Sequence, residues 1–385
     1  MKKFFVFCFV IFLFVPFVYA EENDEILARN AKSAILIEES TGEILYEFNS
    51  HEKSSPASMT KMMSLLLIME AIEKDALKWN QIITVSSNAS SMGGSQILLE
   101  TGERMSVEDL VKGISIASGN DAVVALAEAI AGTEENFVVM MNKRAKDMGL
   151  KDTNFKNCHG LDEEGHYSSA YDMAFIAREL VKHEKILEYS SIYETYLREG
   201  TSKKIWLVNT NKLVRFKSGV DGLKTGYTNS AGFCLTATMK QDGMRVIATV
   251  MGEPDSTTRN NEVSQMLDYA YATVGLKKVL SKKSVVKSIN LSKSLQDEIK
   301  IVPVEDVNIL YKRLDGEFVP TYDIKIDDLT APIKKGDIVG RIYVMNNDKI
   351  VNQVDLTVLE DVNKCNFFQL YGKYLKSIFE GNISF

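Results

Sequence analysis

Strand-like and helix-like segments follow one another along this chain in an order that few folds can accommodate. Apolar runs flanking turn residues predict one β-hairpin near the start and another late in the chain, with mainly helical periodicity between them. Because early and late strands bracket the helices, we expect an α+β fold with one mostly antiparallel sheet. The expected elements are a hairpin at 34–46, a helix from Ser58 to Ile72, helices within 106–183, a hairpin at 233–251 turning at Asp242-Gly243, and a helix at 261–274.

The character of the sequence changes near Lys282, where lysines cluster and short alternating segments begin. Runs such as 322–326 and 338–344 predict a small all-β module. The chain has 385 residues, which is too many for one compact domain. We therefore predict four parts: a signal segment at 1–20, a main α+β domain at 21–280, a small β-rich domain at 281–361 and an amphipathic helix at 362–385.

The first residues have the composition of a cleavable secretory signal. Lys2 and Lys3 precede an apolar stretch at 4–17, and Val18-Tyr19-Ala20 supplies small residues for cleavage. The alternative is a retained membrane anchor, but the stretch is shorter than the roughly 20 apolar residues that a span needs. We expect export across the cytoplasmic membrane, with the mature protein at its outer face or in the cell wall.

The C-terminal segment predicts a helix with one apolar face. Its aromatic and aliphatic residues recur at helical spacing, while Lys373 and Lys376 occupy the opposite side, as in helices that lie on a membrane surface. The alternative is a terminal helix that packs on its own β module. The apolar face consists of Phe367, Phe368, Leu370, Tyr371, Tyr374, Leu375, Ile378 and Phe379.

Several classes of function are disfavoured by composition. The net charge of -7 argues against nucleic acid as a partner. Cys158, Cys234 and Cys365 remain after signal removal, and this odd, widely spaced set predicts packing residues rather than a disulfide framework. Cys158-His159 with His166 nearby matches no common zinc spacing, so we expect no metal site.

A Ser-x-x-Lys motif stands where a loop turns into the first predicted helix. A spacing of three places Ser58 and Lys61 on one helical face, about one turn apart. The hydroxyl of serine is a weak nucleophile and needs an adjacent base. Lys61 could serve as that base if burial lowered its pKa. Taken alone the motif is common, and most chance copies are solvated surface.

Two further motifs follow. Ser118-Gly119-Asn120 lies between two predicted helices, where the hydroxyl could relay a proton and the amide could hold a substrate carbonyl. The alternative is an ordinary helix cap. Lys224-Thr225-Gly226 opens a predicted edge strand, where the cation and hydroxyl could bind a carboxylate. Gly226 would then let the substrate backbone approach closely.

The three motifs in this order form the signature of penicillin-binding proteins and serine β-lactamases. The chain resembles the low-molecular-mass penicillin-binding D-Ala-D-Ala carboxypeptidases, the S11 serine peptidases, over nearly its whole mature length. The resemblance covers the small β domain and terminal helix and rests mainly on the segments at 55–63, 117–122, 220–228 and 244–252. The segment at 209–214 is similar to the branch found in spore-forming bacteria.

This resemblance implies a β-lactamase/DD-peptidase-like catalytic domain without a cofactor. The implied substrates are peptidoglycan stem pentapeptides, which lose their terminal D-alanine through an acyl-enzyme, and β-lactams are implied covalent inhibitors. Backbone N–H groups of Ser58 and Tyr227 are the implied oxyanion donors. The implied catalytic residues are Ser58, Lys61 and Ser118, and the implied substrate-binding residues are Asn120, Lys224, Thr225, Gly226 and Tyr227.

The chain also departs from the family pattern. Thr210 stands where some members carry an arginine that supports the substrate carboxylate, so we expect Lys224, Thr225 and Arg245 to supply more of that contact. Tyr227 stands where some members have histidine. The segment at 157–161 has a cysteine where the family segment has proline, and we interpret it as structural support.

Three other functions remain open from the sequence. A serine β-lactamase shares the motifs, although no glutamate-bearing loop of the class A type is evident. A DD-transpeptidase or endopeptidase would use the same acyl-enzyme, and sequence separates these activities poorly. A non-catalytic wall-binding protein could keep the fold, but the intact Ser58, Lys61 and Lys224 argue against it.

Overall fold

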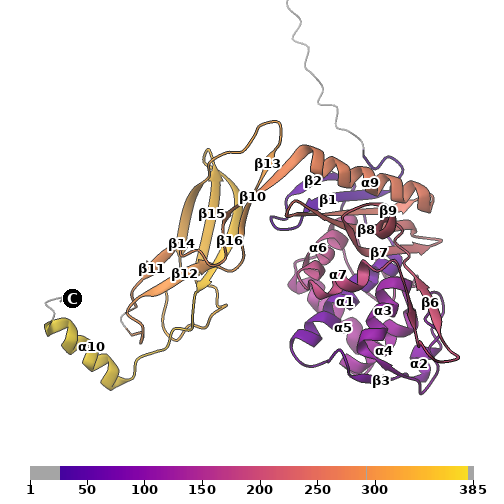
Figure 1. Ribbon diagram of the computed structural model, residues 1–385, viewed down its shortest axis with the longest axis horizontal. Helices are drawn as coiled ribbons and strands as arrows, with labels where there is room; N and C mark the ends of the chain where they lie inside the picture. Colours follow the sequence, from indigo (N-terminus) through magenta and orange to yellow (C-terminus); the bar gives the residue numbers. More distant parts are fainter. Residues whose placement is uncertain (1–26, 292, 380–385) are drawn as a thin grey trace, which may run out of the picture.

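The computed structural model describes residues 27–291 and 293–379. The predicted signal at 1–20 lies outside these residues. Figure 1 shows an α+β domain beside a narrower all-β domain, with a last helix at the far end of the β domain. The predicted α+β class, with a small β-rich part after it, is confirmed.

The α+β domain is built on a five-stranded antiparallel sheet in the order β2-β1-β9-β8-β7. Both predicted hairpins form. The turn between β8 and β9 places Asp242 at φ 51° and Gly243 at φ 82°, the positive angles that a tight hairpin turn requires. The strands are β1 Ser33–Glu38, β2 Ile44–Phe48, β7 Val220–Thr228, β8 Gly232–Gln241 and β9 Met244–Glu253.

Both faces of this sheet are covered, so its inner strands are apolar on both sides. In β1, Ile35 and Ile37 pack into the core with the central helices, whereas Ala34 and Leu36 pack toward α9. Figure 1 shows α9 above the sheet and the other helices below it. The longer helices are α1 Lys61–Glu73, α3 Val107–Ala117, α4 Asn120–Ala131, α5 Glu134–Asp147, α6 Ala170–Val181, α7 Lys185–Ser190 and α9 Ser256–Thr273.

Helix α9 begins five residues before the predicted start at 261. Its first turn is polar and shows no apolar periodicity, but Asp255 caps it by accepting the backbone N–H groups of Thr257 and Thr258. The remaining short elements of the domain are η1 Ala57–Thr60, β3 Ile82–Thr84, α2 Ser87–Ser90, β4 Arg104–Ser106, β5 Glu194–Leu197, β6 Ile205–Val208 and α8 Leu213–Phe216.

The β-rich part contains a two-stranded sheet and a five-stranded sheet in the order β11-β12-β16-β15-β14. Strand β10 follows α9 directly and pairs with β13, so the domain boundary predicted at 280 lies at the end of a strand that joins the two parts. A separate apolar core lies beneath the larger sheet. The strands are β10 Val274–Leu280, β11 Lys287–Ile289, β12 Ile299–Pro303, β13 Val307–Lys312, β14 Thr321–Ile326, β15 Gly340–Asn346 and β16 Lys349–Val358.

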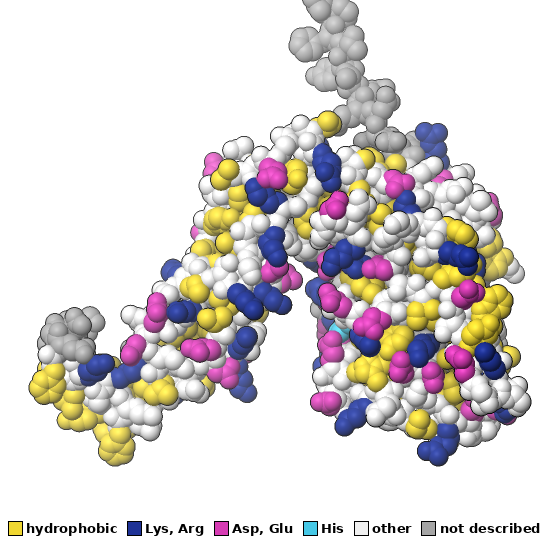
Figure 2. Space-filling view, viewed as in Figure 1, with side chains coloured by type: hydrophobic (Ala, Val, Ile, Leu, Met, Phe, Trp, Pro, Cys, Tyr) yellow, Lys and Arg dark blue, Asp and Glu magenta, His cyan; other side chains and the backbone are white. Residues whose placement is uncertain are grey.

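The last helix, α10 Phe367–Phe379, presents its apolar face to solvent. Phe368 is 81% exposed and Phe379 is 87% exposed. Figure 2 shows these hydrophobic side chains gathered at the end of the molecule. On the polar side, Lys373 binds the carbonyl of Ser294 and the carboxylate of Asp297, which holds the helix against the β domain. Within the described residues, no helix has the length and apolarity needed to cross a bilayer.

Candidate active site

Ser58 and Lys61 lie at the start of the helix that follows the first hairpin. The predicted α-helix from Ser58 is in fact a short 3-10 turn, η1, and α1 begins only at Lys61. The tighter turn still brings the two side chains together, with Lys61 Nζ 2.9 Å from Ser58 Oγ. Ser58 is half-buried, whereas Lys61 is fully buried.

The environment of Lys61 suits a proton acceptor. Burial lowers the pKa of its amine from about 10.5 to about 7. The same nitrogen donates to the carbonyl oxygen of His159 at 2.5 Å. A neutral amine that donates one N–H to this carbonyl keeps its lone pair available for the Ser58 hydroxyl. The sequence did not identify the His159 carbonyl, because a backbone acceptor has no residue-type signature.

The loop that carries His159 packs directly against the nucleophile turn. Gly160 has φ +89°, and a Cβ there would lie against the Ala57 carbonyl and 3.0 Å from Ser58 N. Only glycine allows this approach. On its other side, the loop is held by Glu134, which accepts the backbone N–H of Cys158. This loop therefore supports Ser58 and Lys61, as expected for the segment at 157–161.

The Ser118-Gly119-Asn120 segment joins α3 to α4 and carries two unpaired buried oxygens. Ser118 has φ 64°, a left-handed conformation that is rare for serine. Its Oγ and the Oδ1 of Asn120 are buried without a partner in the described part of the chain. The Asn120 amide group donates to Gly93 O. Neither oxygen caps a helix, and buried oxygens left open in this way call for a functional explanation.

Asp121 connects this segment to Lys61. Its carboxylate accepts the backbone N–H groups of Ile97 and Leu99, and its charge partly opposes the lowering of the Lys61 pKa. Asp121 lies in the first turn of α4, and α4 packs against α1, the helix that begins with Lys61. Helices α1 and α4, which are far apart in the sequence, therefore lie against each other in this part of the site.

Lys224 and Thr225 lie on β7, the edge strand of the sheet, as predicted. Lys224 is 1% exposed, and burial followed by repulsion from Lys61 lowers its pKa well below the ordinary value. A substrate carboxylate would restore its charge. The Thr225 hydroxyl donates to the Thr210 hydroxyl at 2.8 Å, so Thr210, which stands where some family members carry an arginine, helps to hold Thr225.

Gly226 packs closely against the turn that carries the nucleophile. A Cβ at this position would lie 2.7 Å from the carbonyl oxygen of Pro56 and 3.1 Å from the Cβ of Ala57. A glycine at this position therefore lets β7 pack against η1. The neighbouring Tyr227 is 53% exposed, and its ring packs at a tilt against that of Phe233.

Comparisons with known proteins agree with this geometry. Residues 19–255 match the Peptidase S11 family, D-alanyl-D-alanine carboxypeptidase. Residues 275–364 match the C-terminal domain of penicillin-binding protein 5. The chain is 47% identical to the D-alanyl-D-alanine carboxypeptidase DacF of Bacillus subtilis over 92% of each chain. This chain belongs to the D-alanyl-D-alanine carboxypeptidase family S11.

Solved structures of penicillin-binding proteins share the family fold. Penicillin-binding protein 5 of Haemophilus influenzae aligns with a TM-score of 0.71 and 30% identity, over 87% of this chain and 98% of that one. Penicillin-binding protein D2 of Listeria monocytogenes, in a cefotaxime-bound form, aligns with a TM-score of 0.57 and 29% identity, over 63% of this chain and 97% of that one.

One expectation about the S11 site is wrong. Arg245 makes two hydrogen bonds of 2.8 Å to the Asp221 carboxylate and one to the Thr238 hydroxyl. Arg245 lies near the start of β9, next to the β8–β9 turn, where it pairs with Lys240 of β8. Met251 and Glu253 lie at the other end of β9. Its guanidinium is thus already occupied and does not supply the missing carboxylate contact.

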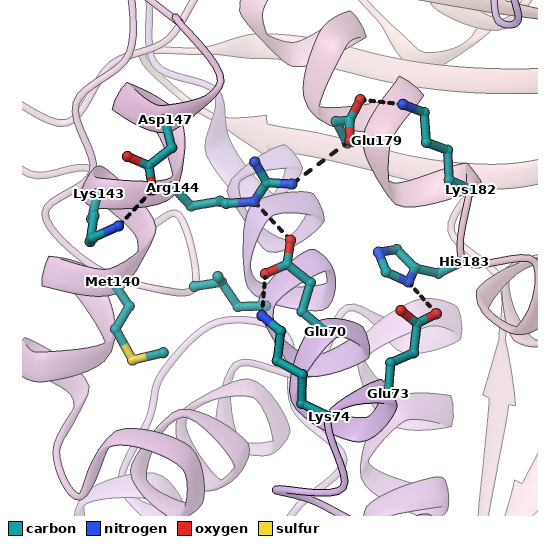
Figure 3. Close-up of a pocket in the computed structure, with 11 residues that line it drawn as sticks. Glu70, Glu73, Lys74, Met140, Lys143, Arg144, Asp147, Glu179, Lys182 and His183 are labelled. Carbon is teal, nitrogen blue, oxygen red and sulfur yellow. Dashed lines mark hydrogen bonds and ion pairs between the residues drawn. The ribbon is translucent and has the colours of Figure 1, made fainter. Parts of the chain in front are cut away.

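A surface hollow of about 700 Å³ lies away from this S11 site. Figure 3 shows it between the ends of α1, α5 and α6, lined by charged side chains that pair with one another. Arg144, for example, binds both Glu70 and Glu179. Glu70 is nine positions after Lys61 on α1, about 13 Å along the helix. Because its charges are mutually paired, we assign the hollow no role in the reaction.

Proposed function

We propose that this S11 family member removes the terminal D-alanine from peptidoglycan stem peptides through an acyl-enzyme on Ser58. The observation that carries the proposal is the buried Lys61 amine 2.9 Å from Ser58 Oγ, with a pKa of about 7. At neutral pH a large fraction of this amine is uncharged. It can therefore accept the hydroxyl proton as Ser58 attacks the carbonyl between the two D-alanines.

The remaining groups fit the other needs of acyl transfer. Backbone N–H groups of Ser58 and Tyr227 are the proposed donors to the oxyanion, each worth about 3–4 kcal/mol by analogy with other acyl-transfer enzymes. Ser118 relays the proton from Lys61 to the departing D-alanine amine. Asn120 holds the substrate backbone. Water then attacks the ester, returns a proton to Ser58 and releases the shortened peptide.

Lys224 and Thr225 bind the carboxylate that marks the end of the stem peptide. Both are almost fully buried on β7, where a carboxylate and an ammonium group attract strongly. A requirement for a free carboxylate at the cleaved end is what distinguishes a carboxypeptidase from an endopeptidase. Among the described residues Lys224 has no acidic partner and donates only to the Thr225 carbonyl, which supports this role.

β-Lactams are proposed covalent inhibitors of the same serine. Their strained amide presents a carbonyl beside a carboxylate, as the stem peptide does. The cefotaxime-bound form of the Listeria relative supports this step for a protein of the same fold.

We propose that the mature protein works at the outer face of the cytoplasmic membrane. The support is the signal-like composition of residues 1–20 and the exposed aromatic face of α10, with Phe367, Phe368 and Phe379 each at least 75% exposed. Such a face inserts into the headgroup boundary of a bilayer. The resemblance at 209–214 and the B. subtilis relative support a role in a spore-forming bacterium.

The test is D-alanine release from an acyl-D-Ala-D-Ala peptide by the wild-type protein and by Ser58→Ala. We expect release by the wild type and none by the variant, with the same thermal unfolding temperature. A wild type that is folded and is acylated by penicillin yet releases no D-alanine would favour the transpeptidase. A wild type that is neither acylated nor active would favour a wall-binding protein.

A further inference from the structure

Strand β7 offers an open edge along which a stem peptide can extend. Within the described residues β7 pairs only with β8, so its other side lacks a strand. Near its start, the carbonyls of Asp221 and Gly222 accept hydrogen bonds from Ser190 and Asn211. Among the described residues, no side chain donates to the carbonyl of Tyr227. Because the N–H and C=O of one residue face the same side of an antiparallel strand, this carbonyl faces the same side as the proposed oxyanion donor. An extended peptide can add to this part of the edge as an extra strand.

The proposed carboxypeptidase reaction fixes the direction of that peptide. Its terminal carboxylate lies at Lys224 and Thr225, and its reacting carbonyl lies between the N–H groups of Ser58 and Tyr227. The residues that precede D-alanyl-D-alanine must then run antiparallel to β7, toward Thr228. At about 3.4 Å per residue, the residue directly before D-alanyl-D-alanine comes level with Thr228.

Asp162 lies at this end of β7. Its Oδ1 accepts the Thr228 hydroxyl at 2.9 Å and the Ser55 hydroxyl at 2.8 Å. Ser55 is three residues before Ser58, so the carboxylate is tied both to the edge strand and to the nucleophile segment. Although burial opposes it, hydrogen bonds from Ser230, Ser55 and Thr228 hold the pKa of Asp162 below its ordinary value. The group is therefore ionised at neutral pH.

The negative charge at this position has no cation to balance it. Asp162, Glu163 and Glu164 are consecutive and exposed, and no lysine, arginine or histidine of the described chain forms an ion pair with any of them. Within the described chain, the Glu163 carboxylate accepts one side-chain hydrogen bond, from the amide of Asn157. By contrast, the acids that line the hollow of Figure 3 all have basic partners.

We propose that Asp162 forms a subsite for a cationic side chain on the substrate residue that directly precedes D-alanyl-D-alanine. The inference deepens the proposed carboxypeptidase function and rests on it. A side-chain amine a few carbons long, on a residue level with Thr228, can reach the Asp162 carboxylate from the peptide backbone. The stem peptides favoured by this chain are then those whose third residue is a diamino acid with a free amine.

The test compares two peptides that differ only in charge: Nα-acetyl-L-Lys-D-Ala-D-Ala and its Nε-acetylated form. The wild type should have a kcat/KM several-fold higher for the peptide with the free amine, the range of a partly exposed ion pair. In Asp162→Asn the ratio between the two peptides should fall to about 1. Asparagine retains the oxygen that accepts from Ser55 and Thr228, so the variant removes charge with little change of contacts.

Asp242→Asn is the matched control, because it removes one exposed negative charge at the opposite end of the same sheet. Its ratio should equal that of the wild type. Raising the salt concentration should lower the wild-type ratio and leave that of Asp162→Asn unchanged. An equal ratio in wild type and Asp162→Asn would overturn the subsite. Cleavage of the Nε-acetylated peptide tests the proposed carboxypeptidase function separately from the subsite. That proposed function is contradicted only if neither peptide is cleaved.

Discussion

Lys61 Nζ donates to the carbonyl oxygen of His159 at 2.5 Å, across 98 positions of sequence. This contact orients a buried amine whose other neighbour is the Ser58 hydroxyl. One N–H is therefore committed to a backbone acceptor that cannot titrate. The lone pair of the neutral amine is left for Ser58, and the protonation state of Lys61 decides whether the serine can react.

The first prediction concerns pH. Since the pKa of Lys61 is about 7 and only its neutral form accepts a proton, kcat/KM should rise with pH with a midpoint near 7. Lys61→Arg should lose about 100-fold to 10,000-fold in kcat/KM at every pH, because a guanidinium does not deprotonate in this range. A wild-type profile that is flat between pH 6 and pH 8 would contradict the assignment of Lys61 as the base.

The second prediction concerns the packing of β7 on η1. Gly226→Ala places a Cβ 2.7 Å from the Pro56 carbonyl oxygen, and both partners are backbone segments with little room to move. We expect the variant to lose about 1–3 kcal/mol of unfolding free energy and at least 10-fold in the rate of penicillin acylation. Gly372→Ala is the control, since a Cβ there meets nothing within 4 Å and both properties should stay as in the wild type.

The third prediction concerns the support of Thr225. Thr210→Val removes the hydroxyl that accepts from Thr225, a contact worth about 1 kcal/mol. KM for an acyl-D-Ala-D-Ala peptide should rise about five-fold while kcat changes little, because the contact positions the carboxylate site and not the reacting serine. Thr210→Ser should restore the wild-type KM. If the valine variant lowers kcat instead, Thr210 acts on the chemical step.

The fourth prediction concerns stability. Burial, followed by a hydrogen bond with the side chain of Glu262 and by its charge, raises the pKa of Glu253 to about 8. Its folded pKa exceeds the unfolded value near 4.5, so the folded state holds a proton that the unfolded chain releases. The free energy of unfolding should therefore fall as pH rises from about 5 to about 8.

Glu253→Gln should remove this slope, because glutamine cannot ionise. Urea unfolding of both proteins at pH 5 and pH 8 measures how the free energy of unfolding changes with pH. The variant should differ least from the wild type at pH 5 and be the more stable protein at pH 8. Equal slopes in both proteins would show that another group is responsible.

The fifth prediction concerns α10. A truncation after Asn366, directly before α10, should abolish flotation with vesicles that contain anionic lipid, while D-alanine release from a soluble peptide stays at the wild-type level. The helix touches the β domain through Lys373 and makes no contribution to the three apolar cores. Truncated protein that still floats with the vesicles would place the membrane contact elsewhere.

Local patterns in the sequence were sufficient to predict many of the strands, turns and helices of the fold. The turn at Asp242-Gly243 and the amphipathic face of α10 were predicted because each depends on neighbouring residues. The start of α9 was missed because a polar first turn has no periodicity, and its cap at Asp255 is the only local signal. Ser58 was placed in an α-helix because the sequence does not separate a 3-10 turn from the helix that continues it.

By itself, the sequence determined which chemical groups are present, their order and the family to which they point. Tertiary structure alone decided what those groups can do. Burial gives Lys61 its pKa, and the His159 carbonyl orients it. Gly226 lets β7 pack on η1, and Asp221 binds Arg245. Each of these depends on a partner distant in sequence, and both desolvation and backbone contact arise only when the chain has folded.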